Sequence, residues 1–208
     1  MHLYTYDPAP NPRRLGLFLA WKDIDIDTTQ VDLMHLEQLD EAYQRVNPSG
    51  TVPALVLDDG TLMTEVIAIC DYLESLYPQK PLLGTTPLLR AQVLGWDHQI
   101  YMNAFSAVAE ILRNGNANFA DRALPGPTRV PQIPALVDRG RERLRRGWQT
   151  YDDVFSERDF LVGDALTLAD IDLLVCSEFA GWVKESIPDS CGALLAWRDR
   201  VRKITDAG

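Results

Sequence analysis

Apolar and polar positions in the first part of the chain follow the two-residue period of strands and the longer period of helices in turn. The predicted elements are a strand over residues 2–6, a helix through Leu15–Ile24, a strand over 25–33, a hairpin over 52–63 and a helix over 66–76. The hairpin prediction depends on Asp59-Gly60, because glycine accepts the positive φ of a tight turn. This order of elements predicts a compact α/β unit of two layers.

The strand pattern ends at a proline-rich stretch, and only helical patterns follow. They cover residues 88–114, 133–155, 167–184 and 192–203. We therefore predict an α/β domain over 1–78, a linker over 79–87 and an all-helical domain over 88–208. A long proline-rich loop separates the first two helical patterns, and its part over 124–134 is a candidate lid.

Composition narrows the possible functions. The 208 residues carry a net charge of −10, of which residues 1–84, with 13 acidic and 5 basic side chains, contribute −8. An acidic chain repels phosphate backbones, so we expect no nucleic-acid partner. The three cysteines form no C-x-x-C pair, and the three histidines are scattered, so neither a disulfide scaffold nor a metal centre is expected. With no apolar run long enough for a membrane, a cytoplasmic protein is expected.

Two segments of the α/β part could bind a ligand through their backbone. If the Val52–Pro53 bond were cis, the N–H and C=O of Val52 would turn outward and could pair with an extended peptide; most X–Pro bonds are trans. Thr64-Glu65-Val66 precedes a predicted helix, whose first N–H groups are free to bind an anion. Glu65 would then receive a ligand amine, or it simply complements the helix dipole.

Two other motifs lie at predicted helix starts. Arg13 and Arg14 are cations where the helix dipole disfavours them, which points to an acidic ligand if they are not simply solvated. Thr167 and Asp170 have the spacing of a capping box, which we interpret as structural.

These residues resemble the cytosolic glutathione S-transferases, in a bacterial-type form. The resemblance is carried by the segments 47–55, 58–60 and 64–74, and by Phe160–Asp164 followed by Thr167–Ile171. It implies a thioredoxin-like N-terminal domain, an all-α C-terminal domain, a homodimer, and glutathione as co-substrate without a metal or other cofactor.

The resemblance also assigns glutathione-binding roles. It implies that the Val52–Pro53 bond is cis and that the backbone of Val52 pairs with the cysteinyl part of glutathione. It also implies that Glu65 and the residue after it hold the γ-glutamyl end. Here that next residue is Val66, where the family commonly has serine, so a hydroxyl contact to the ligand carboxylate is lost. Arg14 and backbone N–H groups are expected to offset the acidity of the domain locally.

The residue that activates the glutathione thiol is left open between two candidates. Tyr6 lies near the position of the activating tyrosine in related enzymes. Asn11 lies near the position of their activating serine or cysteine, and we favour Asn11. Each could donate a hydrogen bond to the sulfur. Such help is needed because a thiol of pKa about 8.5 is only about 3% ionised at pH 7. The alternative for Tyr6 is a strand residue packed in the core.

The predicted reaction is the addition of the glutathione thiolate to a small apolar electrophile. Pro10, Tyr101 and Phe105 are candidates for the electrophile pocket. The alternatives are a non-catalytic member of the fold that binds or regulates a partner, and a glutathione-dependent peroxidase, isomerase or lyase.

Overall fold

The computed structural model describes residues 1–207, and the chain divides into two units. Unit 1 comprises residues 1–80 and 124–130, and unit 2 comprises 81–123 and the chain from 131 onward. None of the helices within residues 1–207 is long and apolar enough to cross a membrane.

Unit 1 is built on a four-stranded sheet in the order β2-β1-β3-β4. Its elements are β1 (His2–Thr5), α1 (Pro10–Trp21), β2 (Asp27–Gln30), the single 3₁₀ turn η1 (Glu37–Leu39), α2 (Glu41–Gln44), β3 (Ala54–Val56), β4 (Leu62–Met63) and α3 (Val66–Leu76). β1 runs parallel to β2 and antiparallel to β3, and β3 pairs antiparallel with β4. The predicted strands and helices of this part are thus present, with shorter strands than the pattern indicated.

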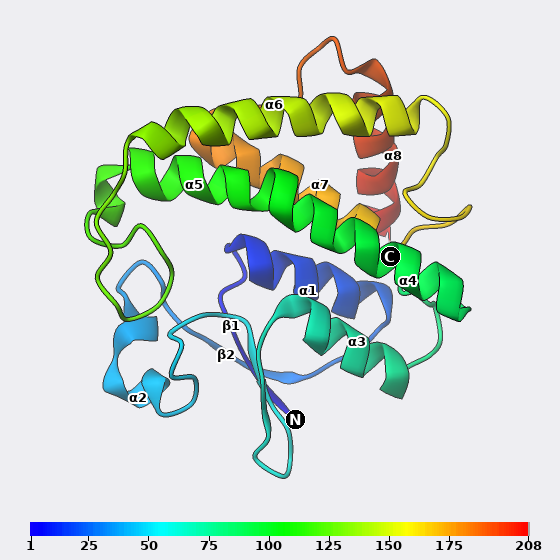
Figure 1. Ribbon diagram of the computed structural model, residues 1–208. Helices are drawn as coiled ribbons and strands as arrows, with labels where there is room; N and C mark the ends of the chain where they lie inside the picture. The colour runs from blue at the N-terminus through cyan, green and yellow to red at the C-terminus, as the bar shows by residue number, and fades with distance from the viewer. Residues whose placement is uncertain (208) are drawn as a thin grey trace. The chain divides into compact units, whose positions relative to one another are not determined.

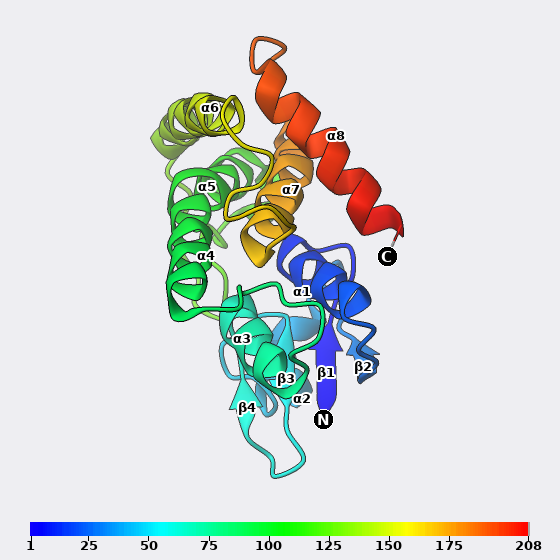
Figure 2. The same cartoon turned by 90° about the vertical axis from the view of Figure 1, so that its right-hand side faces the viewer.

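The alternation of side chains along β1 gives the sheet two different faces. Leu3 and Thr5 are buried, and α1 and α3 pack side by side over one face of the sheet (Figure 1; Figure 2). Tyr4 points to the opposite face, where its ring meets Tyr43 of α2 edge-on with 5.9 Å between the centroids. The second face is therefore covered near Tyr4, whereas the residues of β2 are exposed.

A buried ion pair links the ends of α1 and α3. Lys22 Nζ lies 2.9 Å from Glu74 Oε2, and both side chains are almost completely buried. Lys22 Nζ also donates to the carbonyl oxygens of Tyr77 (2.8 Å) and Gln79 (2.7 Å). Because these acceptors satisfy the buried ammonium, the pair fixes the course of the chain after α3.

Unit 2 is helical. Its elements are α4 (Pro87–Ile100), a π-helical turn (Tyr101–Phe105), α5 (Ser106–Gly115), the 3₁₀ turn η3 (Ala117–Phe119), α6 (Ala135–Phe155), α7 (Leu168–Ala180), the 3₁₀ turn η4 (Gly181–Val183) and α8 (Gly192–Ala207). The helix predicted over 88–114 is present, because the chain is helical from α4 through α5, and the π-helical turn is a local widening between them that the pattern did not predict. Figure 1 shows α6 alongside α5. They approach closely at Gly140, where a Cβ atom would lie 2.8 Å from the carbonyl oxygen of Ala107.

The proline-rich segment 124–130 belongs to unit 1, although the chain on either side of it belongs to unit 2. A Cβ atom on Gly126 would lie 3.1 Å from the carbonyl oxygen of Ser49, and one on Gly50 would lie 3.8 Å from Pro127 Cδ. The segment therefore packs on the loop that leads into Val52 and Pro53.

Asp170 organises the interior of unit 2. The predicted capping box is present, and the Asp170 carboxylate accepts hydrogen bonds from the N–H and hydroxyl of Thr167 (3.0 and 2.7 Å). It also accepts from the Leu161 N–H (3.0 Å) and from Trp197 Nε1 (3.1 Å). Burial raises the pKa of Asp170 above its ordinary value, and these donors oppose that change.

We expect Asp170→Asn to lower the free energy of unfolding by about 2–4 kcal/mol, because an amide cannot accept from all of these donors. The control is Asp164→Asn, the same change at an exposed position, with an expected effect within about 0.5 kcal/mol. Urea denaturation of both variants gives the comparison, and equal losses would contradict the role assigned to Asp170.

Candidate functional site

The register of the sheet brings together the segments that the sequence indicated. Tyr4 of β1 pairs with Ala54, and Leu55 pairs with Met63 of β4. Because β3 runs antiparallel to both neighbours, Tyr6 just after β1, Val52 and Pro53 just before β3, and Glu65 just after β4 all lie toward the same end of the sheet. In agreement, Tyr6 packs against the hydrophobic cluster that contains Val52. The end of β1, the start of β3 and the end of β4 therefore meet at one end of the sheet.

The Val52–Pro53 peptide bond is cis. Val52 comes just before β3, and among residues 1–207 neither its backbone N–H nor its C=O has a hydrogen-bond partner. A backbone donor and acceptor left unpaired beside a strand can pair with an extended peptide in the manner of a sheet edge.

A network of polar side chains holds the loop before Val52 in place. The carbonyl oxygen of Thr51 accepts from the Tyr43 hydroxyl (2.6 Å) and from Asn47 Nδ2 (2.8 Å). Asn47 Oδ1 in turn accepts from the Ser49 N–H at 3.1 Å, as in an Asx turn. Burial raises the pKa of Tyr43 to about 12, so its hydroxyl stays protonated as a donor through neutral pH. The sequence analysis did not identify Tyr43 or the role of Asn47.

Glu65 has an unusual backbone conformation directly before α3. Its φ of 66° and ψ of 119° lie outside the regions that residues other than glycine commonly adopt. Its side chain is exposed and forms no ion pair with any of residues 1–207. Because the first N–H groups of α3 have no acceptor in the helix, a carboxylate acceptor and free N–H donors lie next to each other here. Val66, the first residue of α3, is buried and offers no side-chain hydrogen bond.

Asn11 is the second residue of α1, beyond the turn that follows Tyr6. Its Oδ1 accepts from Arg14 Nη1 at 3.2 Å, which leaves the Nδ2 amino group as the half of the amide available to donate to a ligand. Arg14 is only 6% exposed, so its guanidinium acts on this amide from the protein side.

The predicted electrophile-pocket residues are distributed over both units. Pro10 begins α1 in unit 1. Tyr101 and Phe105 lie at the two ends of the π-helical turn in unit 2, with their rings stacked at 6.2 Å, and Phe105 also contacts Phe179 at 5.3 Å. Tyr101 is half exposed and Phe105 is buried. That these residues share one pocket with Pro10 stays a prediction.

No group of three or more histidine, cysteine or acidic side chains within residues 1–207 has an arrangement that could hold a metal ion. The polar groups described at this end of the sheet are the backbone N–H and C=O of Val52, the carboxylate of Glu65, the amide of Asn11 and the phenol of Tyr6.

Comparisons with known proteins agree with this geometry. The N-terminal domain model of glutathione S-transferase matches residues 9–76, and the C-terminal domain model matches residues 91–204. Glutathione S-transferase 2 of Saccharomyces cerevisiae is 31% identical over 98% of this chain and 86% of its own length. GstA of Escherichia coli is 30% identical over 77% of this chain and 73% of its own length.

Solved structures extend the comparison to the fold. A glutathione S-transferase domain-containing protein of Marinobacter aquaeolei superposes with a TM-score of 0.88 at 30% identity, covering 97% of both chains. Gtt2 of Saccharomyces cerevisiae superposes with a TM-score of 0.87 at 29% identity, covering 97% of this chain and 96% of its own. The thioredoxin-like domain with an all-helical domain is thus confirmed, and the chain belongs to the glutathione S-transferase family.

Proposed function

We propose that this transferase binds glutathione at the sheet end formed by Val52, Pro53, Glu65 and Val66. The glutathione thiol loses its proton to solvent, and the thiolate attacks the electrophilic carbon of a small apolar compound. As the C–S bond forms, either the bond from that carbon to a leaving group breaks and the group departs as an anion, or the π bond of an activated double bond opens and the resulting carbanion takes a proton from solvent. Catalysis then depends on positioning and electrostatic stabilisation, without a covalent enzyme intermediate or a cofactor.

The observation that carries this proposal is the unpartnered backbone of Val52. Its N–H and C=O are a donor and an acceptor of the kind that the cysteinyl peptide group of glutathione requires, and the Tyr43–Asn47 network holds them in place. Pairing at this point would put the sulfur of glutathione near the C-terminal end of β1 and the N-terminal end of α1. Main-chain pairing of this type gives affinity with little dependence on side chains.

Glu65 and the start of α3 suit the γ-glutamyl end of glutathione, which carries both an ammonium and a carboxylate. The free Glu65 carboxylate would pair with the ammonium, and the N–H groups at the start of α3 would bind the carboxylate. The strained backbone of Glu65 is consistent with a binding role, since such conformations concentrate at functional sites.

We favour Asn11 as the activating residue, with Arg14 as a positioning residue for it. The hydrogen bond from Arg14 occupies Asn11 Oδ1, so that Nδ2–H would serve as the donor to the thiolate. Tyr6 remains the alternative, since its ring packs against the cluster around Val52 and its hydroxyl could reach the same sulfur.

The oligomeric state and cellular location that we propose are those typical of the family. We propose a homodimer in the cytoplasm that conjugates apolar electrophiles in detoxification. A glutathione-dependent isomerase is a second candidate reaction, because the maleylacetoacetate isomerase of Pseudomonas aeruginosa is 41% identical over 46% of this chain.

Val66→Ser restores a hydroxyl beside the proposed carboxylate site and should lower the Kd for glutathione about tenfold, the effect of one charge-assisted hydrogen bond. Val66→Ala makes a similar truncation without the hydroxyl and is the matched control. Titration calorimetry measures both, and equal affinity of the two variants would place the γ-glutamyl carboxylate elsewhere.

The identity of the activating residue is tested by ultraviolet titration of bound glutathione thiolate in Asn11→Ala and Tyr6→Phe. The wild-type protein is expected to be retained on immobilised glutathione and to hold the thiol pKa about two units below its free value, a preference of about 2.7 kcal/mol. Asn11→Ala should lose most of this shift, whereas Tyr6→Phe should keep it.

Each other outcome has a distinct meaning. A loss of thiolate in Tyr6→Phe alone would transfer the role to Tyr6, and an unchanged signal in both variants would refute both assignments. A wild-type protein that neither binds glutathione nor ionises it would support the non-catalytic alternative.

A further inference from the structure

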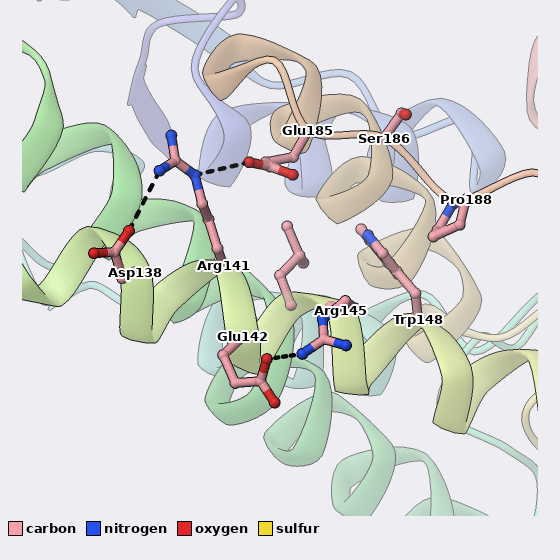
Figure 3. A pocket seen from close by; sticks show the side chains of 9 residues that line it. Asp138, Arg141, Glu142, Arg145, Trp148, Glu185, Ser186 and Pro188 are labelled. Atoms are coloured by element: carbon pink, nitrogen blue, oxygen red, sulfur yellow. Dashed lines mark hydrogen bonds and ion pairs between the residues drawn. The ribbon is translucent and has the colours of Figure 1, made fainter.

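A second candidate site lies in unit 2, entirely within the helical part of the chain. A cavity of about 270 Å³ opens between α6 and the segment Glu185–Pro188, which follows η4 (Figure 3). Its volume is just below the ~300–1,000 Å³ of typical small-molecule pockets, so it suits a ligand of amino-acid size. The proposed glutathione chemistry uses none of its residues.

The floor of the cavity holds a hydrogen-bond donor without an acceptor. Leu144 and Trp148 form this floor and are 1% and 2% exposed. Trp148 Nε1 is buried and has no hydrogen-bond partner within residues 1–207. Figure 3 shows the nitrogen-bearing edge of the indole turned toward the segment Glu185–Pro188. Because an indole N–H can only donate, an acceptor supplied by a ligand would remove the cost of leaving it unpaired.

The rim of the cavity carries charges of both signs. Arg141 lies 3.0 Å from Glu185 and 3.5 Å from Asp138, and Arg145 pairs with Glu142. The Arg141–Glu185 pair joins the two walls, and its side chains are partly exposed. Exposed ion pairs contribute little to stability, so a charged ligand can exchange with them and reach the floor.

We propose that this cavity binds a small zwitterion of the amino-acid or short-peptide class. The segment Glu185–Pro188 would shift to uncover the buried Trp148 Nε1–H, and the ligand carboxylate would accept from this N–H and pair with Arg141. The ligand ammonium would pair with an acidic residue of the rim, and an apolar side chain would lie against Leu144 and Pro188. A ligand with a single charge would pair with either the acidic or the basic side chains of the rim, but not with both.

The indole N–H signal of Trp148 reports directly on binding. The chain has five tryptophans, and Trp148→Phe identifies the signal of Trp148 in the ¹H–¹⁵N spectrum of the full chain. L-Phenylalanine should shift this signal in a saturable manner. 3-Phenylpropionate, which lacks the ammonium, and phenethylamine, which lacks the carboxylate, should bind at least about tenfold more weakly.

Variants test the donor and the rim separately. Because Trp148→Phe removes the reporting signal, titration calorimetry measures the affinities of the tryptophan variants. Trp148→Phe should weaken L-phenylalanine binding about tenfold, whereas Trp182→Phe, which removes an exposed indole in the same unit, should leave the affinity unchanged. Arg141→Ala keeps the Trp148 signal and should weaken binding similarly, which covers the case in which Trp148→Phe does not fold. Equal binding of the three compounds, or no shift with any of them, would overturn the proposal.

Discussion

The pairing of β3 with both of its neighbours is the constraint on which the glutathione site depends. β3 has only three residues, yet its register against β1 and β4 decides that Tyr6, Val52 and Glu65 reach the same end of the sheet. A shift by one residue would turn buried Leu55 toward the opposite face and move Val52 away from the start of α1. The buried core of unit 1 and the geometry of the site are therefore fixed by the same hydrogen bonds.

The proposed site would bind an anion in the more acidic part of the chain, and this is compatible with the chain's charge because local and distant charges act differently. Most of the −8 carried by residues 1–84 lies on exposed side chains, and solvent and salt screen such charges beyond about 10 Å. The free N–H groups at the start of α3 and the Arg14–Asn11 pair act at hydrogen-bond distance. Glu65, an acid placed where an anionic ligand binds, is explained by the ammonium that the same ligand carries.

Features with a local signal could be predicted from the sequence, and features made by distant contacts could not. The hairpin at Asp59-Gly60 and the capping box at Thr167 follow from short patterns and are present. The Lys22–Glu74 pair joins side chains 52 positions apart, and the sequence pattern around neither residue predicts the pair. The role of Tyr43 could not be predicted either, because its hydroxyl bonds a carbonyl oxygen eight residues away in a loop. The loop over 124–134 is predicted from its prolines, but the place of residues 124–130 in unit 1 depends on contacts with the loop at Ser49.

The pairing of glutathione with the backbone of Val52 and with the start of α3 is the central feature of the proposed site. Backbone ¹H–¹⁵N spectra recorded while glutathione is added test it, because each amide reports its own hydrogen bond. We expect the largest saturable shifts at the backbone N–H groups of Val52 and Val66 and at the side-chain Nδ2–H of Asn11, with the amides of α8 unchanged. Binding that leaves the Val52 and Val66 signals in place while shifting amides elsewhere would contradict it.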